Sequence, residues 1–107
     1  MVVRRFEVWV VSLDPSVGSE MQKPRPALVV SPDEMNNRLN TVLVVPLTKW
    51  GFAAPFRVPC QFAGISGQIA LDHLRSVDKR RLARQLGQLD HATAKTVLAT
   101  LRELFEE

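Results

Sequence analysis

The sequence predicts a mainly β fold with short helices: a small antiparallel sheet that curls into a barrel and is closed by a C-terminal amphipathic helix. Three observations lead to this prediction. The 107 residues suffice for one domain around one core. Short apolar runs rich in β-branched residues are separated by Gly, Pro, Asn and Asp. Too few residues lie between most runs for the helical crossovers that parallel strands need.

Six segments have the pattern of strands. They are Phe6–Leu13, Arg25–Val30, Val42–Leu47, Phe56–Phe62, Gln68–Leu74 and Arg84–Leu89. The third is almost continuously apolar, which is typical of a central strand buried on both faces. The fourth contains Pro59, which favours an edge strand or a bulge. Gly64 and Gly67 are expected to bracket the turn before the fifth.

Three segments have helical signals. In the run Ser31-Pro32-Asp33-Glu34, Ser31 is a candidate N-cap and Glu34 follows it at the spacing of a capping box. One helical turn is expected within Val77–Leu82. Asp90 is a candidate cap for a helix from His91 to about Phe105, whose apolar positions recur every three or four residues. These positions are Val97, Leu98, Leu101, Leu104 and Phe105.

Composition narrows the class of protein. The net charge of +3 favours a polyanionic partner. Cys60 is the only cysteine, so no intrachain disulfide is possible and a reduced, cytoplasmic location is expected. The apolar runs are too short to span a bilayer, and the N-terminus lacks the pattern of a signal peptide, so no membrane partner is expected.

Several kinds of active site lack support in the sequence. With one cysteine and with His73 and His91 far apart, no zinc-type ligand spacing exists. There is no G-x-S-x-G nucleophile elbow and no glycine-rich phosphate loop. We therefore expect neither a metal nor another cofactor.

The stretch GSEMQKPRP, residues 18–26, is a candidate site. Pro24 and Pro26 restrict the backbone on either side of Arg25, which would hold the arginine extended at a strand start. The alternative is a strand-initiating arginine paired with Glu20 at the surface. Thr48 ends the run VLVVPLT, where it is either a site residue or simply a β-favouring residue.

An aromatic loop follows Thr48. Trp50 and Phe52 are able to stack on unpaired bases, with Lys49 and Arg57 tracking phosphates. The alternative for the aromatic rings is the core or a subunit interface, which is the better interpretation of Phe56. His73 either donates a proton or pairs structurally with Asp72. The basic turn of Arg80 and Arg81 is either a phosphate contact or a solvated face.

Together these segments resemble a known family. The stretches EVWVVSLDPSVGSEMQKPRPALVVSPDEMN, NTVLVVPLT and IALDHLRSVDKRRL resemble the MazF/PemK toxin endoribonucleases of bacterial toxin–antitoxin pairs. The similarity covers nearly the whole chain, in the order and spacing of the family. It implies a single toxin domain over residues 1–107, with the fold of an SH3-like barrel.

The resemblance also implies an activity. A homodimer would cut single-stranded RNA at short sequences without a metal, through attack by the 2′-hydroxyl, and would thereby inhibit translation and growth until a cognate antitoxin binds. Arg25, Thr48 and Glu20 match the catalytic positions. The remaining residues expected to contact RNA are Ser19, Gln22, Lys23, Lys49, Trp50, Phe52, Arg57, His73 and Arg75.

Two departures and two alternatives accompany the resemblance. Phe6 stands where the family usually has glycine, and His73 stands where it commonly has a glutamine suited to reading a base. One alternative is a toxin of the same fold that inhibits DNA gyrase without cutting RNA. The other is a catalytically inactive RNA-binding relative. The combination of Glu20, Arg25 and Thr48 favours the ribonuclease.

Overall fold

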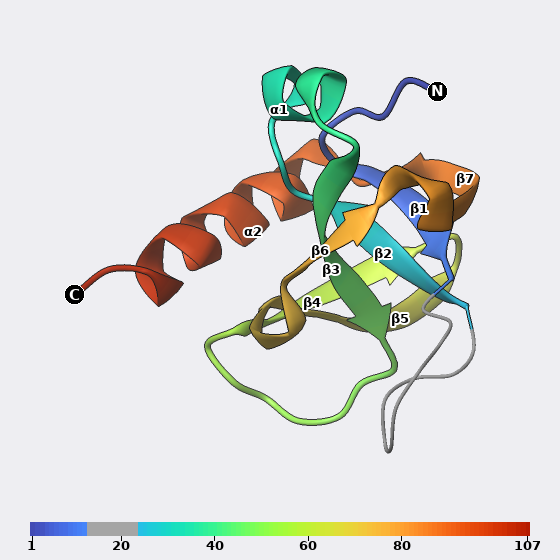
Figure 1. Ribbon diagram of the computed structural model, residues 1–107. Coiled ribbons are helices and arrows are strands. Elements are labelled where there is room, and N and C mark those ends of the chain that lie inside the picture. The colour runs from blue at the N-terminus through green and yellow to red at the C-terminus, as the bar shows by residue number, and fades with distance from the viewer. Residues whose placement is uncertain (13–23) are drawn as a thin grey trace, which may run out of the picture.

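The structure, a computed structural model, describes residues 1–12 and 24–107 as a curled antiparallel sheet with one long helix against it (Figure 1). The strands are β1 (Glu7–Val11), β2 (Arg25–Val29), β3 (Thr41–Thr48), β4 (Arg57–Phe62), β5 (Ile65–Ala70), β6 (Arg75–Asp78) and β7 (Leu82–Gln88). The helices are α1 (Asp33–Arg38) and α2 (His91–Leu104), with 3₁₀ turns η1 (Leu71–His73) and η2 (Lys79–Arg81). The predicted antiparallel β fold with a C-terminal helix is confirmed.

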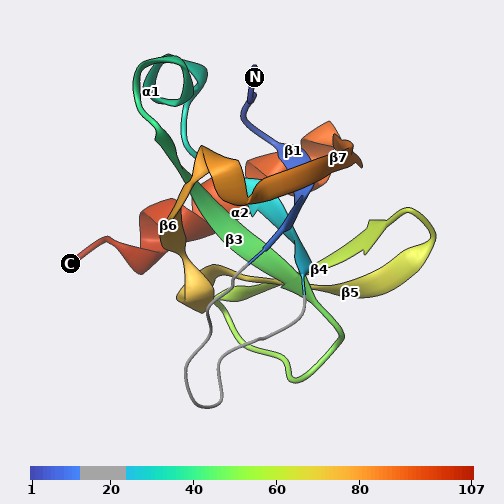
Figure 2. The same ribbon diagram turned by 45° about the vertical axis from the view of Figure 1, so that its right-hand side comes forward.

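β3 is the central strand of the sheet. The strand order is β4-β5-β3-β2-β1-β7, and β6 pairs with β3 beside β5. Among the described residues β4 and β7 form the two ends of this path and do not pair with each other. The sheet curls strongly, as predicted (Figure 2), and differs from a complete barrel in one detail, since its described ladder stays open between β4 and β7. The edge position predicted for the Pro59 strand is confirmed, since β4 is an end strand.

The strands β1, β2 and β3 are buried on both faces of the sheet. Alternate residues of β1, β2 and β3 point to opposite sides, as the pleat requires. Val8, Leu28 and Val45 belong to the core cluster that also contains Ala94 and Val97 of α2. Their sequence neighbours form a second cluster on the other face: Trp9, Ala27, Val29 and Val44, with Val77 and Leu82. This two-sided burial explains why these strands are almost continuously apolar.

A two-residue hairpin joins β4 to β5. Ala63 and Gly64 both have positive φ, 53° and 78°, the signature of a tight hairpin turn whose twist matches the strands. The turn therefore ends at Gly64, and residues 65–67 pair back onto β4. The fifth strand was predicted at Gln68–Leu74; it begins at Ile65 and ends at Ala70, with η1 following. Gly67, expected in the turn, lies inside β5.

The two helices begin differently. Asp90 caps α2 as predicted, because its carboxylate accepts from the backbone N–H of Thr93 at 2.9 Å. The capping box predicted for α1 was wrong: Ser31 lies before the cap position, and its buried hydroxyl bonds to Asn36 Oδ1 and the Leu43 N–H. The apolar stripe of α2 is buried at Val97, but Phe105, just after its end, is 71% exposed.

Phe6 explains one departure from the family pattern. Its φ is 72°, a left-handed conformation that costs a residue with a Cβ but suits glycine. The residue directly precedes β1 and donates its backbone N–H to the carbonyl of Val29. A glycine would reach this geometry without strain, whereas Phe6 adds a ring that packs against the core cluster.

Candidate functional site

A cavity of about 480 Å³ at one side of the sheet brings Arg25 and Thr48 together. β2 and β3 pair with Ala27 opposite Pro46. Continuing that antiparallel register by two residues sets Arg25 opposite Thr48, so that both side chains point to the same face. Lys49 also lines this cavity. Its apolar wall comes from Pro26, Leu47, Cys60, Phe62, Ile65 and Leu86. Two residues 23 positions apart thus share one hollow.

Arg25 and Thr48 each lie at the end of a strand. Arg25 is the first residue of β2, between its two prolines, as predicted, and is half-buried. Thr48 is the last residue of β3 and pairs with Gln68 of β5. Its hydroxyl donates to the Gln68 carbonyl at 3.4 Å, a long hydrogen bond. A hydroxyl held this weakly can readily exchange that partner for another acceptor.

Four predicted site residues fall outside the described residues. Ser19, Glu20, Gln22 and Lys23 belong to positions 13–23. Their roles remain predictions from the sequence.

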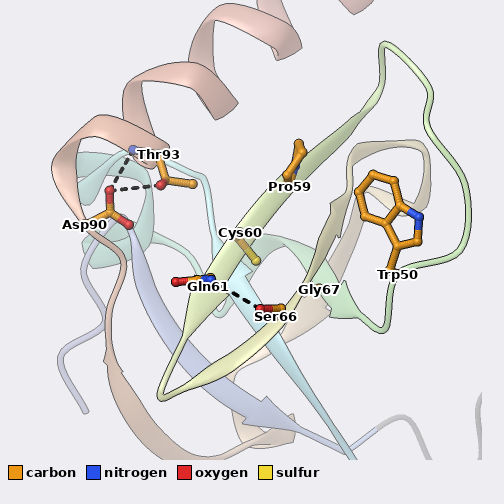
Figure 3. A pocket seen from close by; sticks show the side chains of 8 residues that line it. All are labelled: Trp50, Pro59, Cys60, Gln61, Ser66, Gly67, Asp90 and Thr93. Atoms are coloured by element: carbon orange, nitrogen blue, oxygen red, sulfur yellow. Dashed lines mark hydrogen bonds between the residues drawn. The ribbon is translucent and has the colours of Figure 1, made fainter.

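A second cavity, of about 650 Å³, contains Trp50 (Figure 3). Trp50 stands on one side of the β4–β5 hairpin, and Asp90 and Thr93 at the start of α2 lie on the other side. Cys60 and Gly67 line both cavities. Partial burial raises the pKa of the Cys60 thiol, which the negative charge of Asp90 reinforces, so this thiol is a poor nucleophile. Trp50 is 55% exposed, as expected of a ring available for stacking.

Arg57 is held in a cluster rather than extended into solvent. Its Nε and Nη2 donate to the two carboxylate oxygens of Asp72 at 2.7 and 2.9 Å. Its guanidinium also lies over the Phe52 ring, 4.7 Å from the centroid. The hydrogen bonds between Arg57 and Asp72 lower the pKa of Asp72 and raise that of Arg57. With its charge compensated by Asp72, Arg57 is well placed to position Phe52.

His73 and Arg75 stand near this cluster at the surface. His73 lies in η1, not in the strand expected there, and its Nε2 is 3.4 Å from Asp72 Oδ2. This geometry fits the alternative in which His73 pairs with Asp72. Arg75 is exposed at the start of β6, opposite Val44. Arg80, in the basic turn, bonds to Asp78.

Gln68 is the residue that sequence reasoning missed. It is fully buried in β5, where its side chain bonds to Gly51, Phe52 and Arg57. The sequence offered one signal, an uncharged polar residue beside an apolar pair in a strand (GQIAL). A buried amide of this kind needs several partners, and only the fold identifies them.

The described residues hold neither a metal-ligand cluster nor a membrane-spanning helix. No group of three or more His, Cys, Asp or Glu side chains is arranged to hold a metal ion among residues 1–12 and 24–107. No helix in the described part of the chain has the length and apolar character needed to cross a membrane.

Known proteins similar to this chain include endoribonucleases, and solved MazF structures share its fold. Endoribonuclease PemK of Escherichia coli is 37% identical over 105 residues, which cover 92% of this chain and 79% of that protein. Endoribonuclease MazF9 of Mycobacterium tuberculosis is 36% identical over 101 residues, covering 85% and 86%. MazF from Deinococcus radiodurans superposes with a TM-score of 0.82 at 31% identity, covering 97% and 96%.

A solved MazE–MazF complex of the same organism superposes with a TM-score of 0.81 at 30% identity, covering 97% and 96%. Residues 4–105 match the family model described as PemK-like, MazF-like toxin of type II toxin-antitoxin system. The resemblance predicted from the motifs is therefore confirmed: the chain belongs to the PemK/MazF family of toxins.

Proposed function

We propose that this chain is a single-domain, sequence-specific, metal-independent endoribonuclease that cuts single-stranded RNA within the Arg25–Thr48 cavity. The observation that carries the proposal is the convergence of Arg25, Thr48 and Lys49 on one cavity. The relatives PemK and MazF9, at 37% and 36% identity, are named endoribonucleases, which supports the same reaction class.

The proposed reaction uses the substrate's own 2′-hydroxyl. Its oxygen forms a bond to the adjacent phosphorus while the bond from phosphorus to the 5′-oxygen breaks. The proton of the 2′-hydroxyl passes to Glu20 as general base, and the departing 5′-oxygen takes a proton from water. The hydroxide left behind is neutralised by the proton held on Glu20. The products are a 2′,3′-cyclic phosphate and a 5′-hydroxyl end. No atom is supplied by a cofactor.

Arg25 and Thr48 would act on the phosphate. A guanidinium remains protonated at physiological pH and offers several donors in a fixed plane. This suits Arg25 to stabilising the charge that develops on the five-coordinate phosphorus. The Thr48 hydroxyl would donate to a phosphate oxygen in place of its long bond to Gln68. Two groups on neighbouring strands would thus hold the phosphate in line for attack.

RNA would approach along the aromatic loop. Lys49 joins the phosphate site to Trp50 and Phe52, which are 55% and 50% exposed. Half-exposed rings next to a cationic cavity are suited to stacking with unpaired bases. Ser19, Gln22 and Lys23 would contact RNA from the segment before Arg25, and Arg75 from the surface.

We further propose that the toxin is a cytoplasmic homodimer, inhibits translation by cutting mRNA, and is neutralised by a cognate antitoxin. Support for the antitoxin comes from the solved MazE–MazF complexes of a relative at 30% identity.

The test is cleavage of a long unstructured RNA in EDTA, with both product ends mapped. Wild type should cut at one recurring short motif and leave 5′-hydroxyl ends. Arg25→Ala should lower kcat by about 100-fold or more, the usual cost of removing one electrostatic stabiliser. Thr48→Val keeps the strand-favouring shape and removes only the hydroxyl.

Arg38→Ala is the matched charge control, because Arg38 lies in α1 and, among the described residues, forms an exposed pair with Glu34 at 3.8 Å. Equal cutting by Arg25→Ala and wild type would refute the site. Inhibition of gyrase supercoiling without RNA cleavage would instead identify the non-nucleolytic alternative.

A further inference from the structure

Gln68 is buried at a position where a glutamine side chain lowers stability unless its polar atoms are hydrogen-bonded. Gln68 lies in β5, opposite Thr48 of β3 on one side and Pro59 of β4 on the other. Its side chain is completely buried. Its Oε1 accepts from the Gly51 N–H at 3.0 Å, and its Nε2 donates to the Phe52 carbonyl at 3.0 Å. The buried side-chain amide therefore supplies hydrogen-bond partners to backbone groups of a segment that belongs to no strand.

The segment that Gln68 bonds is the aromatic loop, residues 49–56, which joins β3 to β4 without helix or strand. This segment extends away from the body of the sheet in both ribbon views (Figures 1 and 2). Gly51 allows the close approach, because a Cβ there would lie 3.2 Å from Gln68 Oε1. The two bonds therefore fix the backbone next to Trp50 and at Phe52.

Arg57 gives the same loop a second support. Its Nη1 donates to Gln68 Oε1 at 3.2 Å while the rest of the guanidinium binds Asp72 and covers Phe52. Phe52 in turn meets Phe56 edge to face, with centroids 6.4 Å apart. The Gln68 side chain thus bonds both to the backbone of the aromatic loop and to Arg57.

We propose that Gln68 is a positioning residue for RNA recognition: it holds the aromatic loop so that Trp50 and Phe52 are presented to an unpaired base. The recognition step rests on the proposed function. The Gln68 carbonyl also accepts from Thr48, so one residue ties the recognition loop to the phosphate site. Gln68 itself touches no substrate.

The experiment compares Gln68→Met, which keeps the length and removes the polar atoms, with Ile69→Val. Ile69 is the next residue, equally buried, and belongs to the core cluster rather than the loop. The probe is an RNA oligonucleotide of the cleaved sequence with a 2′-deoxy sugar at the cut. Gln68→Met should bind it about tenfold more weakly, as expected for lost buried hydrogen bonds. Ile69→Val should bind it as wild type does.

Turnover separates positioning from catalysis. At saturating RNA, kcat of Gln68→Met should change by less than about threefold, because only the presentation of the bases is lost. Without RNA, acrylamide should quench the fluorescence of Trp50 more strongly in Gln68→Met than in wild type or Ile69→Val. Trp9 interferes little, since it is 8% exposed. Gln68→Glu keeps the acceptor for Gly51 and Arg57 and should recover part of the binding.

Amide hydrogen exchange tests the idea in unmodified protein, even if Gln68→Met does not fold. The Gly51 N–H should be protected in wild type, because it donates to a buried side chain. Exchange at the rate of a free peptide would overturn the proposal, as would binding and quenching equal to those of Ile69→Val. Absence of any RNA binding by wild type would refute the proposed function, while quenching and exchange would still decide the role of Gln68.

Discussion

Gly67→Ala is expected to inactivate the toxin without touching substrate. A Cβ at position 67 would lie 2.3 Å from the backbone carbonyl oxygen of Thr48, whereas ordinary contacts begin at 3.4 Å. Strands β3 and β5 must therefore move apart by about 1 Å in Gly67→Ala, at a cost of about 1–3 kcal/mol of stability. The displaced atom belongs to the residue proposed to hold the phosphate, and a shift of about 1 Å at a reacting group costs about 100-fold in rate.

The assay is kcat for RNA cleavage together with the free energy of unfolding, both below the melting transition. Gly64→Ala is the matched control: its φ of 78° strains an alanine by about 1–2 kcal/mol, but nothing lies within 4 Å of the added Cβ. Gly64→Ala should lose stability and keep its rate, while Gly67→Ala should lose both. A Gly67→Ala enzyme with kcat within about twofold of wild type would refute the link between β5 and Thr48.

Three further predictions concern stability. Phe6→Gly should be more stable than Phe6→Ala by about 1 kcal/mol in denaturant titrations, because only alanine keeps the strain at φ 72°; equal stabilities would contradict this. The hydrogen bond from Arg57 lowers the pKa of Asp72. The ionised Asp72 therefore stabilises the fold above about pH 4, and this stabilisation is lost as the pH falls through the lowered pKa. The difference in unfolding free energy between wild type and Asp72→Asn should therefore shrink below about pH 4, whereas a constant difference would show that the pair adds nothing. Asp90→Ala should lower Tm and Asp90→Ser should restore most of it, since serine keeps an acceptor for the Thr93 N–H; a Tm unchanged in Asp90→Ala would exclude the cap.

Local patterns predicted the parts of the fold that depend on local chemistry. The apolar run before Thr48 predicted a central strand, and Asp90 predicted the start of α2; both are confirmed. The hairpin at Ala63–Gly64 was missed because alanine seldom adopts positive φ, so the turn appeared to extend to Gly67. Ser31 has the local pattern of a helix cap, but burial next to Asn36 gives its hydroxyl a different partner.

The candidate site also combines residues predicted from motifs with neighbours that only the fold brings to them. The motifs predict Arg25 and Thr48 as site residues, yet 23 positions separate them along the chain. Only the pairing of β2 with β3 brings them to one cavity. Arg57 is predicted to track phosphates beside the aromatic rings, and that role stays a prediction. Only the fold brings Asp72, 15 residues away in sequence, within 2.7 Å of Arg57.

By itself, the sequence determined the mainly β class, the membership in a toxin family and the chemical character of the candidate site, because these depend on residue type and short-range spacing. Only the tertiary structure decided that the described part of the sheet stays open, that Gly67 must lack a side chain against Thr48 and that Gln68 anchors the aromatic loop. Those features depend on contacts between segments distant in sequence. Their partners are selected by burial and by the need to satisfy buried polar groups, and neither is visible in a local pattern.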